Sequence, residues 1–314
     1  MIGTISSICQ YLPKNRISIK KFCLEKNWDY KKLIDKTGIK FIYKSKQDES
    51  ALSMAITAAK KLKIKKNDIN ALIYVTQSPE FHLPTNACVI QDKLNLNKNI
   101  IAFDVNQGCS GFIYGLFLAQ QIIKNNTKGK VLLLCSDTYT KNININNKSC
   151  STIFSDAASA SLISKYKKKN SNFLFYTDGS GAKDLILNYS GFNYKKDLSP
   201  ELFMNGRKVL SFTMNVVPDL IKKLIKKEKI EINKIKYFIF HQASKIVIDN
   251  LTRILNIPSK KVYRNYSKYG NTVSSTIPIC LNELIKKKLV KKGDKILLCG
   301  FGVGLSAGTT IMEV

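Results

Sequence analysis

Short, almost wholly apolar runs alternate along the chain with longer segments in which apolar side chains recur at helical spacing. Residues 70–78, 99–107 and 129–137 are apolar on both faces, which is typical of strands in a parallel sheet. Residues 50–64 and 111–126 have the spacing of amphipathic helices. This alternation predicts an α/β architecture in which helices cover both faces of a sheet.

The second half of the chain repeats the order of elements in the first half. The matching segments are 69–78 with 235–244, 88–106 with 247–265, and 128–137 with 292–301. Agreement in order and spacing over three segments indicates an internal duplication. We therefore expect an N-terminal half over 1–170 and a C-terminal half over 171–314, joined within the less periodic stretch 165–205.

Three residues with catalytic chemistry follow predicted strands of the two halves. Cys109 follows the strand IIAFDV, His241 ends the strand IKYFIF, and Asn271 follows the strand KVYRN. Open α/β sheets build their sites at the carboxyl ends of strands, so packing of the halves can bring these side chains together. Each also has an ordinary structural interpretation: a small core residue, a structural histidine, and a turn residue after Gly270.

The chain is strongly basic, with 51 Lys and Arg residues, 22 acidic residues and a net charge of +29 over 314 residues. This balance permits an acidic partner. Lysine is spread over many segments, however, and no nucleic-acid-binding motif is present, so we expect no nucleic-acid partner. No apolar run reaches the roughly 18 residues of a membrane span, and we expect no membrane association.

The eight cysteines contain no C-x-x-C pair, which argues against a zinc site and predicts free thiols, most of them buried. The first residues have neither the charged start nor the apolar stretch of a signal peptide. We therefore expect a cytoplasmic protein that uses no metal and no cofactor.

Cys, His and Asn together form a familiar nucleophile set. The thiolate is the reactive form, and the N-terminus of the helix predicted after Cys109 lowers a thiol pKa. Backbone N–H groups near Ser110 and Gly111 can approach a reacting oxygen, while His241 and Asn271 can donate to a thioester carbonyl. Papain-like proteases share this order of residues, but their C-G-[SA]-C-[WY] motif is absent and the duplicated α/β pattern does not suit their fold.

The sequence resembles β-ketoacyl-acyl carrier protein synthase III, a condensing enzyme of the thiolase superfamily. The resemblance implies a five-layer αβαβα fold of two similar halves, usually assembled as a homodimer. The matching motifs run nearly end to end in the order and spacing of that family: IGTISSICQYLP, KTGIK, DVNQGCSGF, FSDAASA, DGSG, HQAS, YGNTVSSTIP and GFGVGLSAG.

The resemblance also implies a decarboxylating Claisen condensation that initiates fatty-acid or related acyl chain synthesis. Cys109 would accept an acyl group from an acyl-CoA or an acyl-carrier protein. His241 and Asn271 would bind the thioester carbonyl of malonyl-acyl carrier protein and stabilise the enolate formed as CO₂ leaves. Backbone N–H groups of Cys109 and Val303 would form the oxyanion hole, with Phe301 beside the nucleophile.

Several positions depart from the family pattern. Leu83 stands where a bulky residue of the partner subunit often closes the acyl pocket, which predicts room for a longer or branched acyl chain. Lysine still pairs with phosphate, as a point charge without the fork of arginine. The substrate-side departures are Lys32 for a tryptophan, Lys36 and Lys148 for arginines, Ser244 for an asparagine, and Ile246 for an arginine. Of these, Lys36, Lys148 and Ser244 are expected to contact the substrate.

Three other functions are compatible with the sequence. A same-fold acyltransferase would move the acyl group to an alcohol or an amine, a cysteine hydrolase would release it to water, and a basic binding protein would do no chemistry. Simple acyl transfer has no need of an enolate pocket. The joint presence of Cys109, His241 and Asn271 therefore favours condensation.

Overall fold

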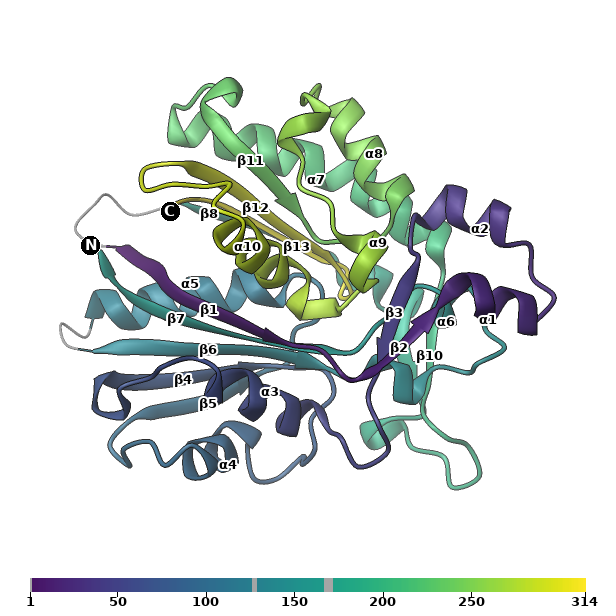
Figure 1. The fold of residues 1–314 in the computed structure, drawn as a ribbon, viewed down its shortest axis with the longest axis horizontal. Coiled ribbons are helices and arrows are strands. Elements are labelled where there is room, and N and C mark those ends of the chain that lie inside the picture. Colours follow the sequence, from purple (N-terminus) through teal and green to yellow (C-terminus); the bar gives the residue numbers. More distant parts are fainter. Residues whose placement is uncertain (1, 126–128, 167–171) are drawn as a thin grey trace.

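The computed structural model describes residues 2–125, 129–166 and 172–314. Its N-terminal part forms a sheet from five strands: β1 (Ile2–Tyr11), β4 (Ile69–Val75), β5 (Ile101–Val105), β6 (Lys130–Asp137) and β7 (Ala157–Tyr166). Their order across the sheet is β1-β7-β6-β4-β5 (Figure 1). β4 is parallel to β5 and β6, whereas β7 is antiparallel to β6 and β1.

The C-terminal part forms a second sheet with the same pattern. Its strands are β8 (Phe173–Thr177), β11 (Ile235–Phe240), β12 (Lys295–Gly302) and β13 (Ser306–Glu313), in the order β11-β12-β13-β8. β11 is parallel to β12, and β13 is antiparallel to both β12 and β8. The directions repeat those of β4, β6, β7 and β1, so the duplication expected from the sequence is confirmed.

The repeat is incomplete at one edge. The strand predicted around KVYRN is reduced to a single parallel bridge between Val262 and Phe238, where the first sheet has β5. A short 3₁₀ turn over Ser259–Lys261 occupies the start of this stretch. The predicted boundary at residue 170 falls outside the described residues and stays a prediction.

Helices and sheets stack in five layers. α5 (Gly111–Asn125) and α10 (Thr276–Lys286) lie between the two sheets (Figure 1). α3 (Ala51–Lys60) and α4 (Asn86–Lys93) pack on the outer face of the first sheet, and α7 (Gly206–Glu228) and α8 (Lys245–Ile254) on the outer face of the second. The αβαβα expectation is therefore confirmed.

The central helix α5 is apolar on several sides because a sheet covers it on each side. Its glycine at position 115 permits a close approach to β6, since a Cβ there would lie 2.6 Å from the Leu133 side chain. The helix begins directly after the turn that carries Cys109. The sheet packing thus holds the N-terminus of α5 rigidly beside that thiol.

Shorter elements gather at one end of the two sheets and surround the site described below (Figure 1). Two small sheets pair β2 (Asn15–Ser18) with β3 (Phe41–Lys44) and β9 (Leu185–Asn188) with β10 (Glu201–Met204). The short helices here are α1 (Ile19–Glu25), α2 (Tyr30–Thr37), α6 (Lys148–Ser151) and α9 (Tyr266–Tyr269). Among the described residues, no helix combines the length and apolar character needed to cross a bilayer.

Candidate active site

Cys109, His241 and Asn271 line one cavity of about 440 Å³, which we call the thiol cavity. Phe301 and Gly302, at the end of β12, line it as well. The three polar side chains come from different parts of the chain: the turn before α5, the end of β11, and the loop after α9. The structure therefore brings together the residues that the sequence singled out.

Cys109 is held by the backbone of β12. A Cβ at Gly302 would lie 2.9 Å from the Cys109 sulfur, and one at Gly300 would lie 2.8 Å from the Cys109 carbonyl oxygen. Glycine is therefore required at both positions for the strand to come this close. The backbone N–H groups of Val303 and of Cys109 itself donate hydrogen bonds to the sulfur. Two backbone donors therefore meet at the sulfur.

The environment of the thiol differs from the sequence expectation. Burial raises the pKa of Cys109 to about 12, although the Val303 and Cys109 N–H groups lower it in part. Desolvation is the largest influence, because Cys109 is only 3% exposed, and the predicted lowering by the N-terminus of α5 is outweighed. In the free protein at neutral pH, Cys109 is therefore a protonated thiol.

His241 is buried and neutral. Its backbone N–H donates to the Cys299 carbonyl at 2.8 Å, which continues the pairing of β11 with β12. Its ring meets Phe301 edge to face, with centroids 5.6 Å apart, and Nδ1 lies 2.8 Å from the Thr276 hydroxyl. Burial lowers the pKa of His241 to about 3. The imidazole therefore takes part in hydrogen bonding without a charge.

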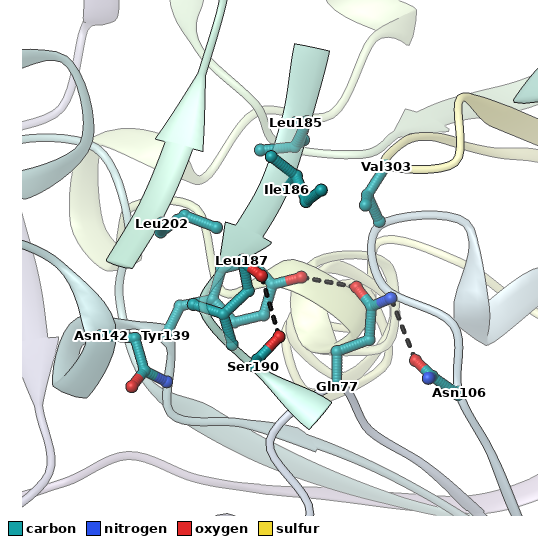
Figure 2. Close-up of a pocket in the computed structure, with 10 residues that line it drawn as sticks. All are labelled: Gln77, Asn106, Tyr139, Asn142, Leu185, Ile186, Leu187, Ser190, Leu202 and Val303. Atoms are coloured by element: carbon teal, nitrogen blue, oxygen red, sulfur yellow. Dashed lines mark hydrogen bonds between the residues drawn. The ribbon is translucent and has the colours of Figure 1, made fainter. Parts of the chain in front are cut away.

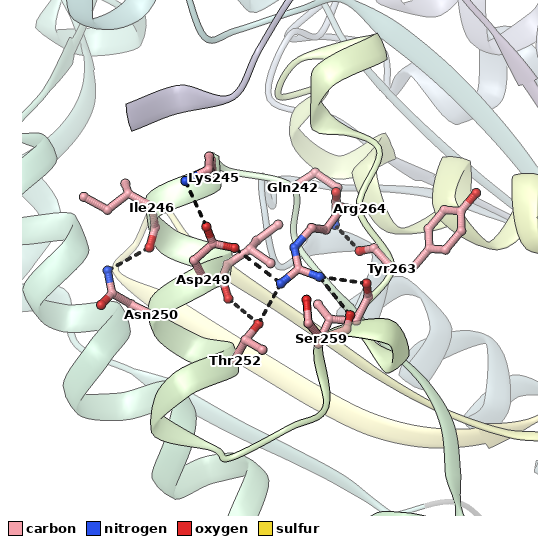
Figure 3. A network of polar contacts seen from close by, with 11 residues as sticks. Gln242, Lys245, Ile246, Asp249, Asn250, Thr252, Ser259, Tyr263 and Arg264 are labelled. Carbon is pink, nitrogen blue, oxygen red and sulfur yellow. Dashed lines mark hydrogen bonds and ion pairs between the residues drawn. The ribbon is translucent and has the colours of Figure 1, made fainter. Parts of the chain in front are cut away.

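The segment that carries His241 is fixed by the buried side chain of Gln242. Its Nε2 donates to the carbonyl oxygens of Phe240 and Tyr263, and its Oε1 accepts from the backbone N–H groups of Asn265 and Tyr266. A neighbouring network ties this turn to α8: Arg264 contacts Asp249 and Thr252, and Asp249 also pairs with Lys245 (Figure 3). These contacts give the histidine a rigid support.

The amide of Asn271 is oriented by its own loop. The backbone N–H of Asn271 donates to Ile153, and its side-chain Oδ1 accepts from the Val273 N–H at 3.0 Å. Val273 has φ 51°, a costly conformation for a β-branched residue, which the buried surroundings maintain. With Oδ1 engaged in this way, the Nδ2 group is the part of the amide available as a donor in the thiol cavity.

The remaining predicted residues fall into three groups. Lys36 and Ser244 line the thiol cavity with Cys109, and their contact with the substrate stays a prediction. Lys148 does not line it, and its ammonium lies over the Trp28 ring, 5.7 Å from the centroid. Leu83 is 89% exposed on a loop and does not line the cavity within this chain. The described residues contain no cluster of three or more potential His, Cys, Asp or Glu metal ligands.

A second cavity of about 280 Å³, which we call the polar cavity, adjoins the thiol cavity, and its lining residues are drawn in Figure 2. Leu185 lines both cavities, and Val303, whose N–H contacts the thiol sulfur, lines this one. The Gln77 carboxamide lies between Tyr139 and Asn106 and bonds to both (Figure 2). The lining residues are Gln77, Asn106, Tyr139, Asn142, Leu185, Ile186, Leu187, Ser190, Leu202 and Val303.

Similarity to known proteins agrees with this geometry. Residues 103–180 match the family model "3-Oxoacyl-[acyl-carrier-protein (ACP)] synthase III", and residues 225–314 match its C-terminal counterpart. Beta-ketoacyl-[acyl-carrier-protein] synthase III of Fusobacterium nucleatum is 31% identical, with 98% of each chain covered. The chain belongs to the 3-oxoacyl-[acyl-carrier-protein] synthase III family. The Clostridium perfringens (strain 13) member is 32% identical over 97% of each chain.

Solved structures of the synthase III family have the same fold. A crystal structure of a 3-oxoacyl-(acyl-carrier-protein) synthase III has a TM-score of 0.96 and 31% identity, with each chain covered completely. The synthase III of Aquifex aeolicus has a TM-score of 0.90 and 29% identity, covering 99% of this chain and 100% of its own. The thiolase-like fold expected from the sequence is therefore confirmed.

Sequence reasoning missed two features of this synthase III site. Arg207, at the start of α7, lines the thiol cavity with Lys36, but a single arginine with no motif around it carried no signal in the sequence. Asp137 accepts hydrogen bonds from the backbone of Gln77 and from both the backbone and the hydroxyl of Ser274. Its carboxyl thus connects Gln77 of the polar cavity to the loop that carries Asn271. In the sequence, only its position at the end of the predicted strand 129–137 pointed to a role at the site.

Proposed function

We propose that this synthase III catalyses a decarboxylating Claisen condensation between an acyl thioester and a malonyl thioester carried by an acyl carrier protein. One observation carries the proposal: a single cavity holds a buried thiol with two backbone donors, together with a neutral imidazole and a carboxamide. A thiol with an oxyanion hole suits acyl transfer, and two neutral donors suit an enolate. As an enzyme, the chain would be an acyltransferase.

The first step loads the acyl group onto Cys109. The sulfur bonds to the acyl carbon, the bond from that carbon to the donor sulfur breaks, and the thiol proton leaves with the donor thiol. The developing oxyanion accepts hydrogen bonds from the Cys109 and Val303 N–H groups, which lie beside the sulfur. Because the free thiol is protonated, nucleophilic attack and proton loss are coupled.

The second step uses His241 and Asn271 as donors to the malonyl thioester carbonyl. The carboxylate leaves as CO₂, and its electron pair forms an enolate whose oxygen accepts both hydrogen bonds. The α-carbon then attacks the acyl-cysteine, the bond to the Cys109 sulfur breaks, and the thiolate takes up a proton. A neutral imidazole is suited to this task because no strong base is needed.

The mouth of the thiol cavity fits a phosphopantetheine arm. Lys36 and Arg207 supply positive charge for a phosphate, while Ile246 and Val247 supply apolar surface for the arm itself. The net charge of +29 suits an acidic carrier protein. Lys148 and Ser244 stay candidates for contacts with the same arm.

Assembly and location belong to the same proposal. We propose a homodimer, because Leu83 and the neighbouring Phe81 expose apolar surface on one loop that a second subunit would cover. All eight cysteines are free thiols, which fits the reducing conditions of the cytoplasm. Transfer to an alcohol or amine is not favoured, because it leaves His241 and Asn271 without an enolate to bind.

Intact-protein mass spectrometry after incubation with acyl-CoAs and acyl-carrier proteins tests the function. We expect a single acyl adduct on the wild type, absent from Cys109→Ala, that malonyl-acyl carrier protein discharges with release of CO₂. An adduct that the malonyl donor leaves intact would contradict condensation. Failure of every donor to form an adduct would contradict the role of Cys109.

A further inference from the structure

The polar cavity has an unusual lining for a site beside an acyl-accepting thiol. Half of its ten lining side chains can form hydrogen bonds, and none of the ten carries a charge. Pockets for small ligands are mostly apolar, with few polar groups that set specificity. The hydrogen-bonding side chains are Gln77, Asn106, Tyr139, Asn142 and Ser190.

These side chains retain hydrogen-bonding capacity toward the cavity. Gln77 Oε1 accepts from the Tyr139 hydroxyl at 2.5 Å, and Gln77 Nε2 donates one of its two hydrogens to Asn106 Oδ1 at 3.1 Å. The second Nε2 hydrogen has no partner among the described residues, and neither does the side chain of Asn142 within that part of the chain. Asn106 is exposed and Gln77 and Asn142 are half-buried, so water reaches these groups in the free protein. An alkyl group that displaced this water would leave them unpaired.

The position of the cavity ties it to the acyl group rather than to the pantetheine arm. Val303 contacts the Cys109 sulfur through its N–H and lines the polar cavity with its side chain. Tyr139 and Leu185 pack in one cluster with Cys109. The charged mouth formed by Lys36 and Arg207 belongs to the thiol cavity instead.

We propose that the acyl group accepted by Cys109 carries a neutral hydrogen-bonding substituent, a hydroxyl or an amide, which the polar cavity binds through Gln77, Asn106 and Asn142. This inference rests on the proposed function. A carboxylate or an ammonium on the acyl group is disfavoured, because no lining residue supplies the opposite charge. A site built to pair a hydroxyl discriminates against the analogue that lacks it, because its own polar groups are then left unpaired.

The test compares matched thioesters: butyryl-CoA with 3-hydroxybutyryl-CoA, and succinyl-CoA as a charged probe. The rate constant for acylation of Cys109 is followed by intact-protein mass spectrometry, with transfer to malonyl-acyl carrier protein measured on each adduct. We expect 3-hydroxybutyryl-CoA to react about tenfold faster than butyryl-CoA, which is the rate ratio that one additional hydrogen bond provides. Succinyl-CoA should react slowest.

Variants connect that preference to the cavity. Gln77→Met keeps the length of the side chain and removes its hydrogen bonds. In this variant, 3-hydroxybutyryl-CoA and butyryl-CoA should therefore acylate Cys109 at about the same rate. The matched control, Gln121→Met, lies half-buried on α5, about 15 Å along the helix from its start, and should keep the preference. Asn142→Leu provides a second variant should Gln77→Met fold poorly, and it should weaken the preference in the same direction.

The outcomes separate this inference from the proposed function. Butyryl-CoA could acylate Cys109 as fast as 3-hydroxybutyryl-CoA or faster, with normal discharge by the malonyl donor. That result contradicts the proposal of a polar acyl group and leaves the condensation reaction supported. A hydroxyacyl preference that survives both Gln77→Met and Asn142→Leu overturns the assignment to this cavity. Absence of any adduct contradicts the proposed function itself, and this inference with it.

Discussion

The Nδ1 atom of His241 lies 2.8 Å from the hydroxyl oxygen of Thr276. That hydroxyl has one hydrogen and two acceptors within reach, Nδ1 and the Val273 carbonyl oxygen at 3.1 Å. Donation to Nδ1 leaves the proton of the neutral imidazole on Nε2, whereas donation to the Val273 carbonyl leaves the hydroxyl oxygen to accept from Nδ1–H. In either arrangement Thr276 fixes the orientation of the His241 ring through Nδ1.

Substitution of this threonine should impair the malonyl step alone. We expect Thr276→Val to lower the rate of malonyl-dependent discharge about 10- to 100-fold, because the His241 ring loses the hydrogen bond that orients it at Nδ1. Thr276→Ser keeps the hydroxyl and should stay close to wild type. The rate of Cys109 acylation serves as the internal control, since an equal loss in both steps would indicate a packing defect.

Variants of His241 and Asn271 should slow the malonyl step without a comparable loss in the acylation step. His241→Ala and Asn271→Ala are each expected to slow discharge by malonyl-acyl carrier protein about 10²- to 10³-fold, the usual effect of removing one such donor. Acylation should change only a few fold, because the Cys109 and Val303 N–H groups serve that step. Single-turnover mass spectrometry measures both rates. Loss of acylation in both variants would show that His241 and Asn271 act on the thiol instead.

The raised pKa of Cys109 predicts a steep pH dependence of its reactivity. With a thiol pKa of about 12, the thiolate fraction grows about tenfold per pH unit across pH 7–10. Alkylation of Cys109 by iodoacetamide, followed by peptide mass spectrometry, should rise accordingly without a plateau. The same thiol in urea-unfolded protein should level off near its unperturbed pKa of about 8.5. A plateau below pH 8 in the folded protein would mean that α5 outweighs burial.

The charged mouth of the thiol cavity predicts which lysine matters for binding. Lys36→Ala and Arg207→Ala should each raise the KM for acyl-CoA several fold, with little effect on kcat, and the loss should shrink at high salt. Lys148→Ala should raise the KM less, because its ammonium lies over Trp28 and does not line the cavity. A larger rise in KM for Lys148→Ala than for Arg207→Ala would reverse this assignment.

Asp137 should couple stability to pH. Burial raises the pKa of its carboxyl to about 7, whereas an unfolded aspartate titrates near 3.9. Between these values the folded state holds a proton that the unfolded state releases, so stability falls as pH rises, by on the order of 4 kcal/mol in all. In urea titrations from pH 4 to 8, the free-energy advantage of wild type over Asp137→Asn should shrink with pH. A constant difference would show that Asp137 is ionised throughout.

The fold was predictable because its determinants are local and repeated. The apolar runs at 70–78 and 129–137 have no polar face, which predicts strands that are covered on both sides. These runs form β4 and β6, and both strands are covered on both faces of the sheet. The repeated order of segments predicted the second sheet in the same way. The strand predicted at KVYRN does not form, and a single parallel bridge between Val262 and Phe238 ends that edge of the sheet. The prediction was wrong because strand formation depends on a pairing partner, which the local sequence pattern does not describe.

The sequence by itself determined the positions of Cys109 and His241, because each follows the carboxyl end of a strand. Asn271 is placed instead by the loop after α9, because the strand expected before it does not form. Only the tertiary structure decided the protonation states of the thiol and the imidazole. Burial is a property of the whole packed molecule, and it raises the pKa of Cys109 while lowering that of His241. The polar cavity was likewise invisible along the chain, because Gln77, Asn106 and Asn142 meet only when three separate loops converge.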